Sequence, residues 1–417
     1  MSSNELRVRV LSAISEVPPA VWNACAASLP GPTTGARSPG SQACAEASAI
    51  LEQASPNPFT LHEFLLALEA SKSATARAGW QPQHLLVETA QGEVIGAAPC
   101  YLKSHSRGEY VFDWAWADAY ERAGGAYYPK LQVSVPFTPA SGCRLLVRPG
   151  ADSERVRTAL AAGLTELCRL RDASSVHVTF MTAPEWELLG RCGFLQRTDQ
   201  QFHWENAGYA TFEDFLGRLA SRKRKAIRRE RKEAVENGIT IEWLTGSDLT
   251  ESAWDTFFAF YMDTGSRKWG RPYLTRDFFS LVGQSMRDKI ALIMAKRAGR
   301  YIAGAINFIG AGTLFGRHWG AVEHHPFLHF ELCYYQAIEF AIARGLQRVE
   351  AGAQGEHKLA RGYLPVTTRS AHYIADPGLR RAIADFLKRE RAHVAAAGEI
   401  LAAAGPFRKD LVFEEEP

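Results

Sequence analysis

The alternation of apolar and polar residues predicts two similar series of strands and helices along the chain. In the first half we expect strands at 84–88, 94–102 and 110–116, a helix at 155–171, a strand at 176–180 and a helix at 185–191. In the second half we expect strands at 239–243, 290–296, 301–308 and 313–319, a helix at 329–344 and a strand at 347–350. This repeated order predicts an α+β protein built from two duplicated domains with mixed sheets.

A weak internal similarity supports the duplication, since GEVIGAAPCYL in the first half aligns with GRYIAGAINFI in the second. We therefore expect an N-terminal domain over 1–204 and a C-terminal domain over 205–417. Residues 29–48 are rich in Pro, Gly, Ser and Ala and offer little to a core, so 29–54 is predicted to be a flexible insertion.

One long basic helix is predicted between the two halves. Thr211 is a good N-cap with Asp214 three residues later, and Asn237-Gly238 is a good stop. The helix carries a dense run of cations, namely Arg222, Lys223, Arg224, Lys225, Arg228, Arg229, Arg231 and Lys232. Such a run is either a solvated face or an electrostatic platform for RNA or a phosphate-bearing donor. For the second role we name Arg222, Lys223, Arg224 and Arg228.

Composition narrows the class of protein. Hydrophobic residues make up 46% and charged residues 22% of the chain, which is typical of a globular protein, and the net charge is only +3. There is no apolar run long enough to span a membrane and no apolar signal core at the start. The seven cysteines form no CxxC pair. We expect a cytoplasmic protein with reduced cysteines, no metal site and no covalently bound cofactor.

The segment from Glu350 to Lys358 is the strongest candidate for chemistry, because titratable residues there alternate with glycines directly after a central strand. Acylation of an amine needs a base and groups that stabilise an oxyanion. We therefore name Glu350, Glu356 and His357 as catalytic candidates. Lys358 and Arg361 are expected to bind a carboxylate or phosphate of the substrate.

Two further segments are expected to contact the substrate. Residues 264–273 are predicted to form a loop whose Arg267 and Lys268 bind an anion while Trp269 stacks or acts as a lid. Arg317, His318 and Trp319 end the third strand of the second half, although His318 is equally compatible with packing. Cys333 lies on an apolar stripe and is expected to pack in the core. In the first half, Asp113, Trp114, Trp116 and 127–130 are either a second wall of the cleft or packing between domains.

The chain resembles the GNAT-type acyltransferases in this strand–helix order. From about Asn57 to Lys409 it is identified as a member of the FemAB-like acyltransferases, labelled peptidoglycan biosynthesis or recognition proteins. This resemblance rests on long stretches such as GEYVFDWAWADAYERAGG, SRKRKAIRRERK, GRHWGAVEHHPFLHFELCYYQ and VEAGAQGEHKLARGY. It implies two tandem GNAT-like domains, and it implies transfer of an amino acid from aminoacyl-tRNA to an amine of a peptidoglycan precursor.

The co-substrate is the point at which the chain departs from ordinary acetyl-CoA enzymes. These carry a Gly-rich turn before the long helix, whereas residues 320–327 here read GAVEHHPF, with a single glycine. Three hypotheses follow. The first is an N-acyltransferase acting on an amine-bearing small molecule or peptide, with aminoacyl-tRNA bound through the basic helix. The others are a degenerate GNAT pair that binds a peptide or anionic ligand without turnover, and an acyl-CoA-dependent acetyltransferase.

Overall fold

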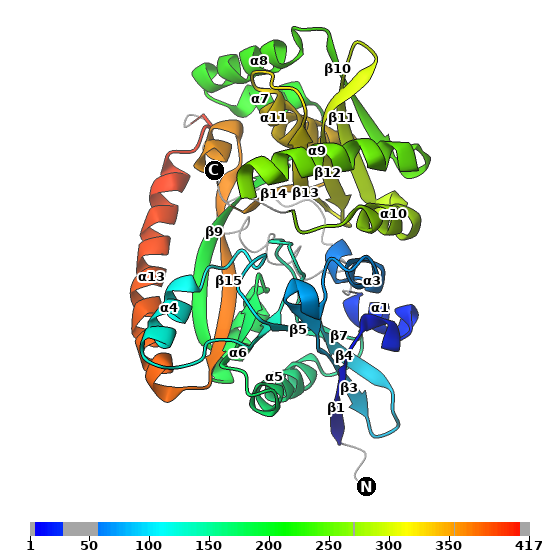
Figure 1. Ribbon diagram of the computed structural model, residues 1–417. Coiled ribbons are helices and arrows are strands. Elements are labelled where there is room, and N and C mark those ends of the chain that lie inside the picture. The colour runs from blue at the N-terminus through cyan, green and yellow to red at the C-terminus, as the bar shows by residue number, and fades with distance from the viewer. Residues whose placement is uncertain (1–4, 28–56, 270–271, 354, 409–417) are drawn as a thin grey trace. The chain divides into compact units, whose positions relative to one another are not determined.

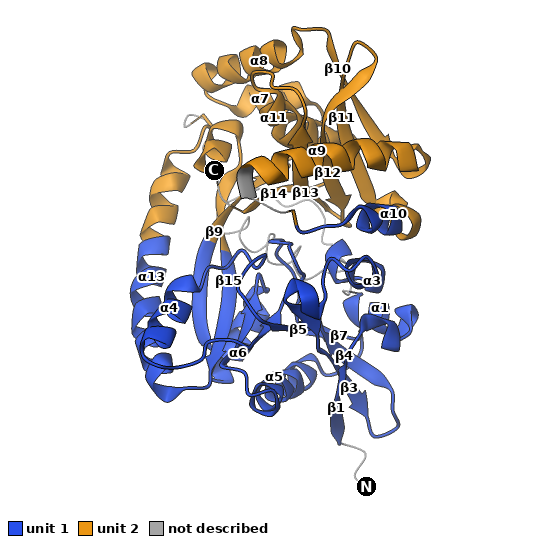
Figure 2. Ribbon diagram, viewed as in Figure 1, with its two compact units in different colours: residues 1–199, 273–282, 368–394 blue, residues 200–272, 283–367, 395–417 orange. Residues whose placement is uncertain are grey.

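The computed structural model describes residues 5–27, 57–269, 272–353 and 355–408 (Figure 1). The chain forms two compact units, coloured separately in Figure 2: unit 1 comprises residues 1–199, 273–282 and 368–394, and unit 2 comprises residues 200–272, 283–367 and 395–417. The domain limits expected from the sequence stay a prediction.

The predicted insertion at 29–54 lies outside the described residues. Among the described helices, none is both long and apolar enough to cross a membrane.

Unit 1 contains a small antiparallel sheet and a second group of strands. The small sheet has the order β1 (Leu6–Leu11), β3 (His84–Thr89), β4 (Val94–Ala98) and β7 (Leu146–Val147). The second group has the order β2 (Trp80–Pro82), β5 (Cys100–Lys103), β6 (Lys130–Val133), β8 (Ser175–Thr179) and the end of β15 (Leu364–Ile374). Within it only β6 and β8 are parallel. Because parallel neighbours need a crossover, α5 (Ser153–Leu170) connects them and buries its apolar stripe against the sheet.

The remaining helices of unit 1 cover these strands. They are α1 (Pro19–Ala26), α3 (His62–Ala70), α4 (Trp114–Arg122), α6 (Ala183–Arg191), most of α10 (Arg276–Ser285) and the first part of α13 (Pro377–Ala403). α5 and α6 share one apolar core, and α4 and α13 share another.

Unit 2 repeats the same order of strands and helix. Its strands are β10 (Ile239–Thr245), β11 (Ile290–Arg297), β12 (Arg300–Ile309), β13 (Thr313–Ala321), β14 (Arg348–Ala353) and the end of β9 (Leu195–Glu205), in that spatial order. β13 and β14 are parallel, and the other pairs are antiparallel. The crossover consists of α11 (Leu328–Phe330), a π-helix at Glu331–Tyr335 and α12 (Gln336–Ala343). The mixed α+β class is thus confirmed, and each unit has the strand–helix order that the resemblance to GNAT domains predicts.

Unit 2 contains further helices, and their limits correct two predictions. The predicted long basic helix is two helices, α7 (Phe212–Arg218) and α8 (Ser221–Val235). Leu219 and Ala220 adopt extended backbone between them, because Leu219 forms a β-bridge with Phe407 and the Ala220 amide donates to Pro406 O. These contacts depend on the far end of the chain, so no local pattern could reveal them.

The predicted loop at 264–273 is also wrong in its first part, because 264–269 form the last turns of α9 (Glu251–Trp269). The glycine that suggested a loop serves packing instead, since a Cβ on Gly265 would lie 2.4 Å from Pro272 Cγ. The described residues after this helix begin again at Pro272.

The third strand expected at 110–116 is not formed. α4 begins there at Trp114, and β6 is the strand that follows β2 and β5 in the second group of strands. The run of aromatic residues suggested a strand. Asp113 in the middle of this run is instead 1% exposed and is the N-cap residue of α4. Similarly, the strand expected at 94–102 is two strands, β4 and β5, which lie in different sheets.

Gly320 in β13 should be the most sensitive glycine of unit 2. A Cβ there would lie 2.2 Å from the backbone C and O atoms of Phe260 in α9, and backbone atoms cannot move aside cheaply. We expect Gly320→Ala to lower the free energy of unfolding by about 1–3 kcal/mol in urea denaturation. Gly217→Ala is the control, since nothing lies within 4 Å of its Cβ in α7, and it should raise stability by about 0.5–1 kcal/mol. Equal effects of both variants would contradict this packing.

Candidate active site in unit 2

The parallel ladder between β13 and β14 is short. It consists of the pairs Thr313–Arg348, Leu314–Val349 and Phe315–Glu350, while both strands continue beyond it. Past the ladder β14 is only half-buried, at Ala351, Gly352 and Ala353. The end of this ladder therefore leaves backbone of a central strand accessible beside Glu350.

Glu350 lies buried at the last pair of the ladder and faces β9 on its other side. His203 is its register partner in β9, and Glu350 Oε2 lies 3.9 Å from His203 Nε2. Burial, with the nearby charges of Arg348 and Lys358, holds the pKa of His203 well below its usual range. His203 is therefore a neutral neighbour of Glu350.

Two cations converge on Gly352, two residues beyond Glu350. Lys358 is buried, and its Nζ donates to Gly352 O at 2.8 Å. A Cβ on Gly352 would lie 3.9 Å from Arg317 Nη1, and this glycine has a φ of +75°. Burial lowers the pKa of Lys358 to about 8, and the charge of Arg317 adds to this effect. A lysine that titrates near neutral pH is typical of functional sites.

A second polar cluster lies beside the first and has a supporting role. Arg361 donates to Glu230 Oε2 at 2.9 Å and to His357 O at 2.8 Å, and its guanidinium lies 3.5 Å from the centre of the Phe330 ring. Tyr335 OH also donates to Glu230. The charge of Arg361 is thus already matched by a carboxylate, which leaves it less suited to bind a substrate anion than Lys358.

The other predicted site residues are dispersed in unit 2. Glu356 is exposed, and His357 accepts or donates a hydrogen bond with Tyr334 OH at 2.9 Å. Arg267 pairs with Asp263 of its own helix and donates to Ala321 O at 2.9 Å. The side chains of Lys268 and Trp269 lie outside the described part of the structure.

The two aromatic residues predicted beside Arg317 have packing partners. The ring of His318 lies 5.1 Å from that of Tyr261 in α9, and burial lowers the pKa of His318 to about 3. The ring of Trp319 lies 5.2 Å from that of His329. Of the predicted residues, the structure brings Lys358 and Arg317 together at Gly352, and Glu350 precedes that glycine by two residues and lies beside His203.

Sequence reasoning missed His203 and the π-helix that contains Cys333. His203 joins the site through the pairing of β9 with β14, across 147 positions of the chain, so no local signal could identify it. The π-helix at 331–335 follows from tertiary contacts, and π-helical turns are frequent at functional sites. Cys333 there is partly buried against two apolar cores, in line with its predicted packing role.

The inner face of α8 is fixed by ion pairs within unit 2. Arg231 binds Glu331 and Glu339, so it is not part of an external platform. Arg222 and Lys225 are exposed, Lys223 and Arg224 are half-buried, and Arg228 pairs with Glu213 at the surface. The first turn of α8 contains no acid, although cations there oppose the helix dipole. This costs helix stability and therefore favours a role outside folding.

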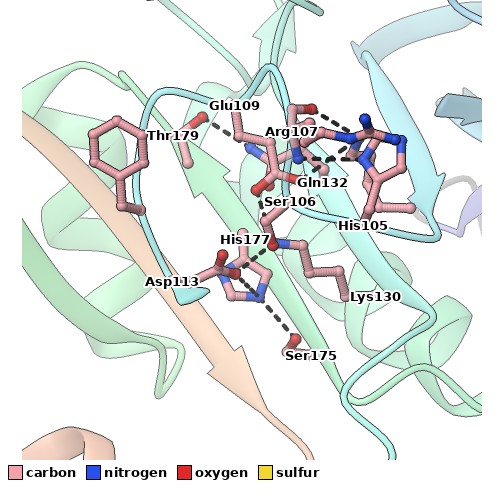
Figure 3. A network of polar contacts seen from close by, with 12 residues as sticks. His105, Ser106, Arg107, Glu109, Asp113, Lys130, Gln132, Ser175, His177 and Thr179 are labelled. Carbon is pink, nitrogen blue, oxygen red and sulfur yellow. Dashed lines mark hydrogen bonds and ion pairs between the residues drawn. The ribbon is translucent and has the colours of Figure 1, made fainter. Parts of the chain in front are cut away.

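Some of the residues named in unit 1 as either a cleft wall or packing between domains belong to a buried ion network (Figure 3). Lys130 Nζ donates to Ser106 Oγ at 2.8 Å, to Glu109 Oε2 at 2.7 Å and to Asp113. Tyr127 OH also donates to Asp113, at 2.7 Å. Trp116 is buried in the core shared by α4 and α13, whereas Trp114 is exposed.

The network extends along one face of the unit 1 strands. Lys103 is the register partner of Lys130 and donates to Arg107 O at 3.3 Å. Burial lowers the pKa of Lys103 to about 7 and raises that of Glu109 to about 7. Two histidines continue the row, with 2.8 Å between His177 Nδ1 and His372 Nδ1. Burial lowers the pKa of both, so the rings are neutral and one must donate to the other.

Lys130 should be indispensable to unit 1. Replacing it with Met leaves the Asp113 carboxylate buried without its lysine and removes the closer of the two lysines beside Glu109, which should cost about 3–5 kcal/mol in unfolding free energy. Glu166→Gln is the control, because Glu166 pairs with Arg169 at the surface and its loss should leave the unfolding midpoint nearly unchanged. Denaturant titration measures both. A Lys130→Met protein as stable as the control variant would show that the network is not needed for folding.

Comparisons with known proteins place the chain in a family. No curated protein matches it. Similar solved structures include FemX, with 12% identity over 76% of this chain and 93% of that one at a TM-score of 0.48. A tandem GNAT protein from the clavulanic acid pathway has 13% identity, 89% and 99% coverage and a TM-score of 0.44. L-PGS from Bacillus licheniformis has 9% identity, 80% and 98% coverage and a TM-score of 0.47.

The FemAB-like family model, described as peptidoglycan biosynthesis/recognition, matches residues 13–409, which is nearly the whole chain. The chain therefore belongs to the FemAB-like family.

Proposed function

We propose that this protein is an N-acyltransferase that passes an acyl or aminoacyl group to an amine, and that the reaction takes place in unit 2 at the end of the β13–β14 ladder. The observation that carries the proposal is that Lys358 and Arg317 meet at the half-buried backbone of Gly352, two residues beyond Glu350 in the same strand. The family description supports a peptidoglycan-related acceptor, such as an amine of a cell-wall peptide.

In this proposal the amine nitrogen attacks the acyl carbonyl carbon and forms the new C–N bond. The bond from that carbon to the oxygen or sulfur of the donor breaks. Glu350 accepts the proton of the amine and returns it to the leaving atom. Charged Lys358 stabilises the negative charge that develops on the carbonyl oxygen, which buried cations do effectively because little water screens them. Arg317 supplies a second positive charge next to Gly352.

The donor that fits best is an aminoacyl-tRNA. The cation-rich first turns of α8 favour a polyanion over a single phosphate group. The usual pyrophosphate position of coenzyme A, at the start of the crossover helix, is also unfavourable here. Glu331 in that first turn is 2% exposed and pairs with Arg231, so a carboxylate already occupies the positive end of the helix. Acyl-coenzyme A is the alternative donor, and binding without turnover is the alternative function.

The pH dependence of turnover tests the role of Lys358. Because only its charged form stabilises an oxyanion, the contribution of Lys358 to kcat/KM should be complete below its pKa of about 8 and should be lost as the pH rises through it, which gives the alkaline limb of the profile. Lys358→Met should lower kcat at least about 100-fold, the usual loss for an oxyanion donor. Lys358→Arg stays charged above pH 8 and should move the descending limb upward.

Glu350→Gln is the matched test of the base, since it keeps the shape of the side chain and removes the charge. It should abolish turnover while leaving donor binding and the unfolding midpoint nearly unchanged. If Glu350→Gln and Lys358→Met both turn over like the parent protein, the chemistry lies elsewhere. If the parent protein binds tRNA and amine but never joins them, it is a recognition protein.

The donor is tested by changing Arg222, Lys223 and Arg224 together to Glu. Since binding to phosphates is electrostatic, affinity for tRNA in a filter-binding assay should fall at least about tenfold and depend steeply on salt. Stability should change little, because such surface substitutions usually cost less than about 0.5 kcal/mol each. Lys388 and Arg389 of α13, changed to Glu, form the control with similar loss of charge. Equal loss of tRNA binding in both variants would contradict a specific role of α8.

A further inference from the structure

Two aromatic residues on unit 1 are exposed although they flank a buried carboxylate. Phe112 is 44% and Trp114 is 56% exposed, and their ring centres lie 5.1 Å apart. Large aromatic side chains are mostly buried in folded proteins, and contiguous exposed ones mark interaction surfaces. Neither residue belongs to the cores of unit 1. Folding alone therefore does not explain this pair.

The backbone of the pair is held firmly from both sides. The Asp113 carboxylate is buried in the ion network of Lys130, and Phe112 O accepts a hydrogen bond from Arg197 Nη1 at 2.8 Å. Asp113 is thus held in the interior, whereas its neighbours Phe112 and Trp114 lie at the surface. Preorganised aromatic side chains lose little freedom when they bind, which makes them good anchors.

Helix α13 adds a third exposed aromatic beside the pair. The guanidinium of Arg197 that binds Phe112 O also binds Glu390 of α13, at 2.7 and 2.8 Å. Phe386 is 40% exposed, and its ring lies 6.4 Å from that of Trp116 in α4. The α4 and α13 helices share one apolar core, so the three exposed aromatics belong to one region of unit 1.

This region is also basic. Arg381, Lys388 and Arg389 are exposed on α13, close to Phe386 in sequence. Glu390 is matched by Arg197, and Asp118 lies 3.7 Å from Arg122 in α4, so exposed Asp385 of α13 offsets one of the three cations and leaves an excess of positive charge. Exposed aromatic rings next to an excess of cations are the combination found in surfaces that rest on anionic membranes.

We propose that Phe112, Trp114 and Phe386, together with Arg381, Lys388 and Arg389, form a docking surface for an anionic phospholipid bilayer. The aromatic rings enter the interfacial layer, where Trp is favoured, while the cations contact lipid phosphates. The rings alone would also suit a neutral sugar, but the adjacent cations favour an anionic partner. The proposal concerns attachment to the membrane surface and does not depend on the chemistry of unit 2.

Co-sedimentation of the full chain with vesicles tests this surface. The protein should bind vesicles that contain phosphatidylglycerol, bind phosphatidylcholine vesicles weakly, and be released by salt. Changing Arg381, Lys388 and Arg389 to Glu should lower the partition coefficient at least about 100-fold. Changing Phe112 and Trp114 to Ser should lower it at least about tenfold, and Trp114→Phe with Phe112 intact should restore most of the binding.

Two controls distinguish binding through this surface from nonspecific adsorption of exposed apolar side chains and from general electrostatic attraction. Leu170→Ser removes another exposed apolar side chain of unit 1, 62% exposed on α5, and should leave binding unchanged. The α8 variant with Arg222, Lys223 and Arg224 changed to Glu should retain most of it. Circular dichroism melting confirms that each variant is folded.

The proposal is overturned if the parent protein does not bind phosphatidylglycerol vesicles. It is also overturned if the Phe112 and Trp114 variant binds as the parent does, or if only the α8 variant loses binding. Binding to isolated peptidoglycan without binding to vesicles would assign the surface to a wall polymer and likewise refute it.

Discussion

The burial of Lys130 between two carboxylates is the constraint on which unit 1 depends. A charge removed from water is tolerated only when partners surround it, and here Ser106, Glu109 and Asp113 all come from the segment after β5. The ion network therefore attaches that segment to the β6 strand. It also determines where α4 begins, because Asp113 cannot bind Lys130 and continue an exposed strand. The position of two exposed aromatic residues at the surface follows from this same attachment.

Comparison of the two units shows how one arrangement of strands serves two purposes. Each unit has a parallel pair joined by a crossover helix, β6 and β8 in unit 1 and β13 and β14 in unit 2. In unit 1 the polar groups on these strands are matched internally and lie deep in the protein. In unit 2 the ladder ends early, and Lys358 and Arg317 meet half-buried backbone at Gly352. Buried ion pairs such as those of Lys130 stabilise unit 1. Cations beside accessible backbone, as at Gly352, are instead placed where they could contact a bound molecule.

The arrangement of α8 separates stability from recognition in a similar way. One side of this helix is attached to the rest of unit 2 by two ion pairs, Glu230 with Arg361 and Arg231 with Glu331. The cations of the first turn, by contrast, weaken the start of the helix, because that turn contains no acid. A helix that is anchored on one side and strongly basic on the other is suited to hold a polyanion near the candidate site of the same unit.

The sequence by itself determined the mixed α+β class and most of the regular elements, because these depend on local periodicity. It also named Glu350 and Lys358 as candidates, because titratable residues stand next to glycines there. Only the tertiary structure decided which polar residues meet. His203 reaches Glu350 through strand pairing, and Arg361 binds the Glu230 carboxylate. The third strand of unit 1 and the break before α8 were also decided by distant contacts. The physical reason is the same in each case: a buried charge or an extended backbone is stabilised by partners that lie far away in the chain.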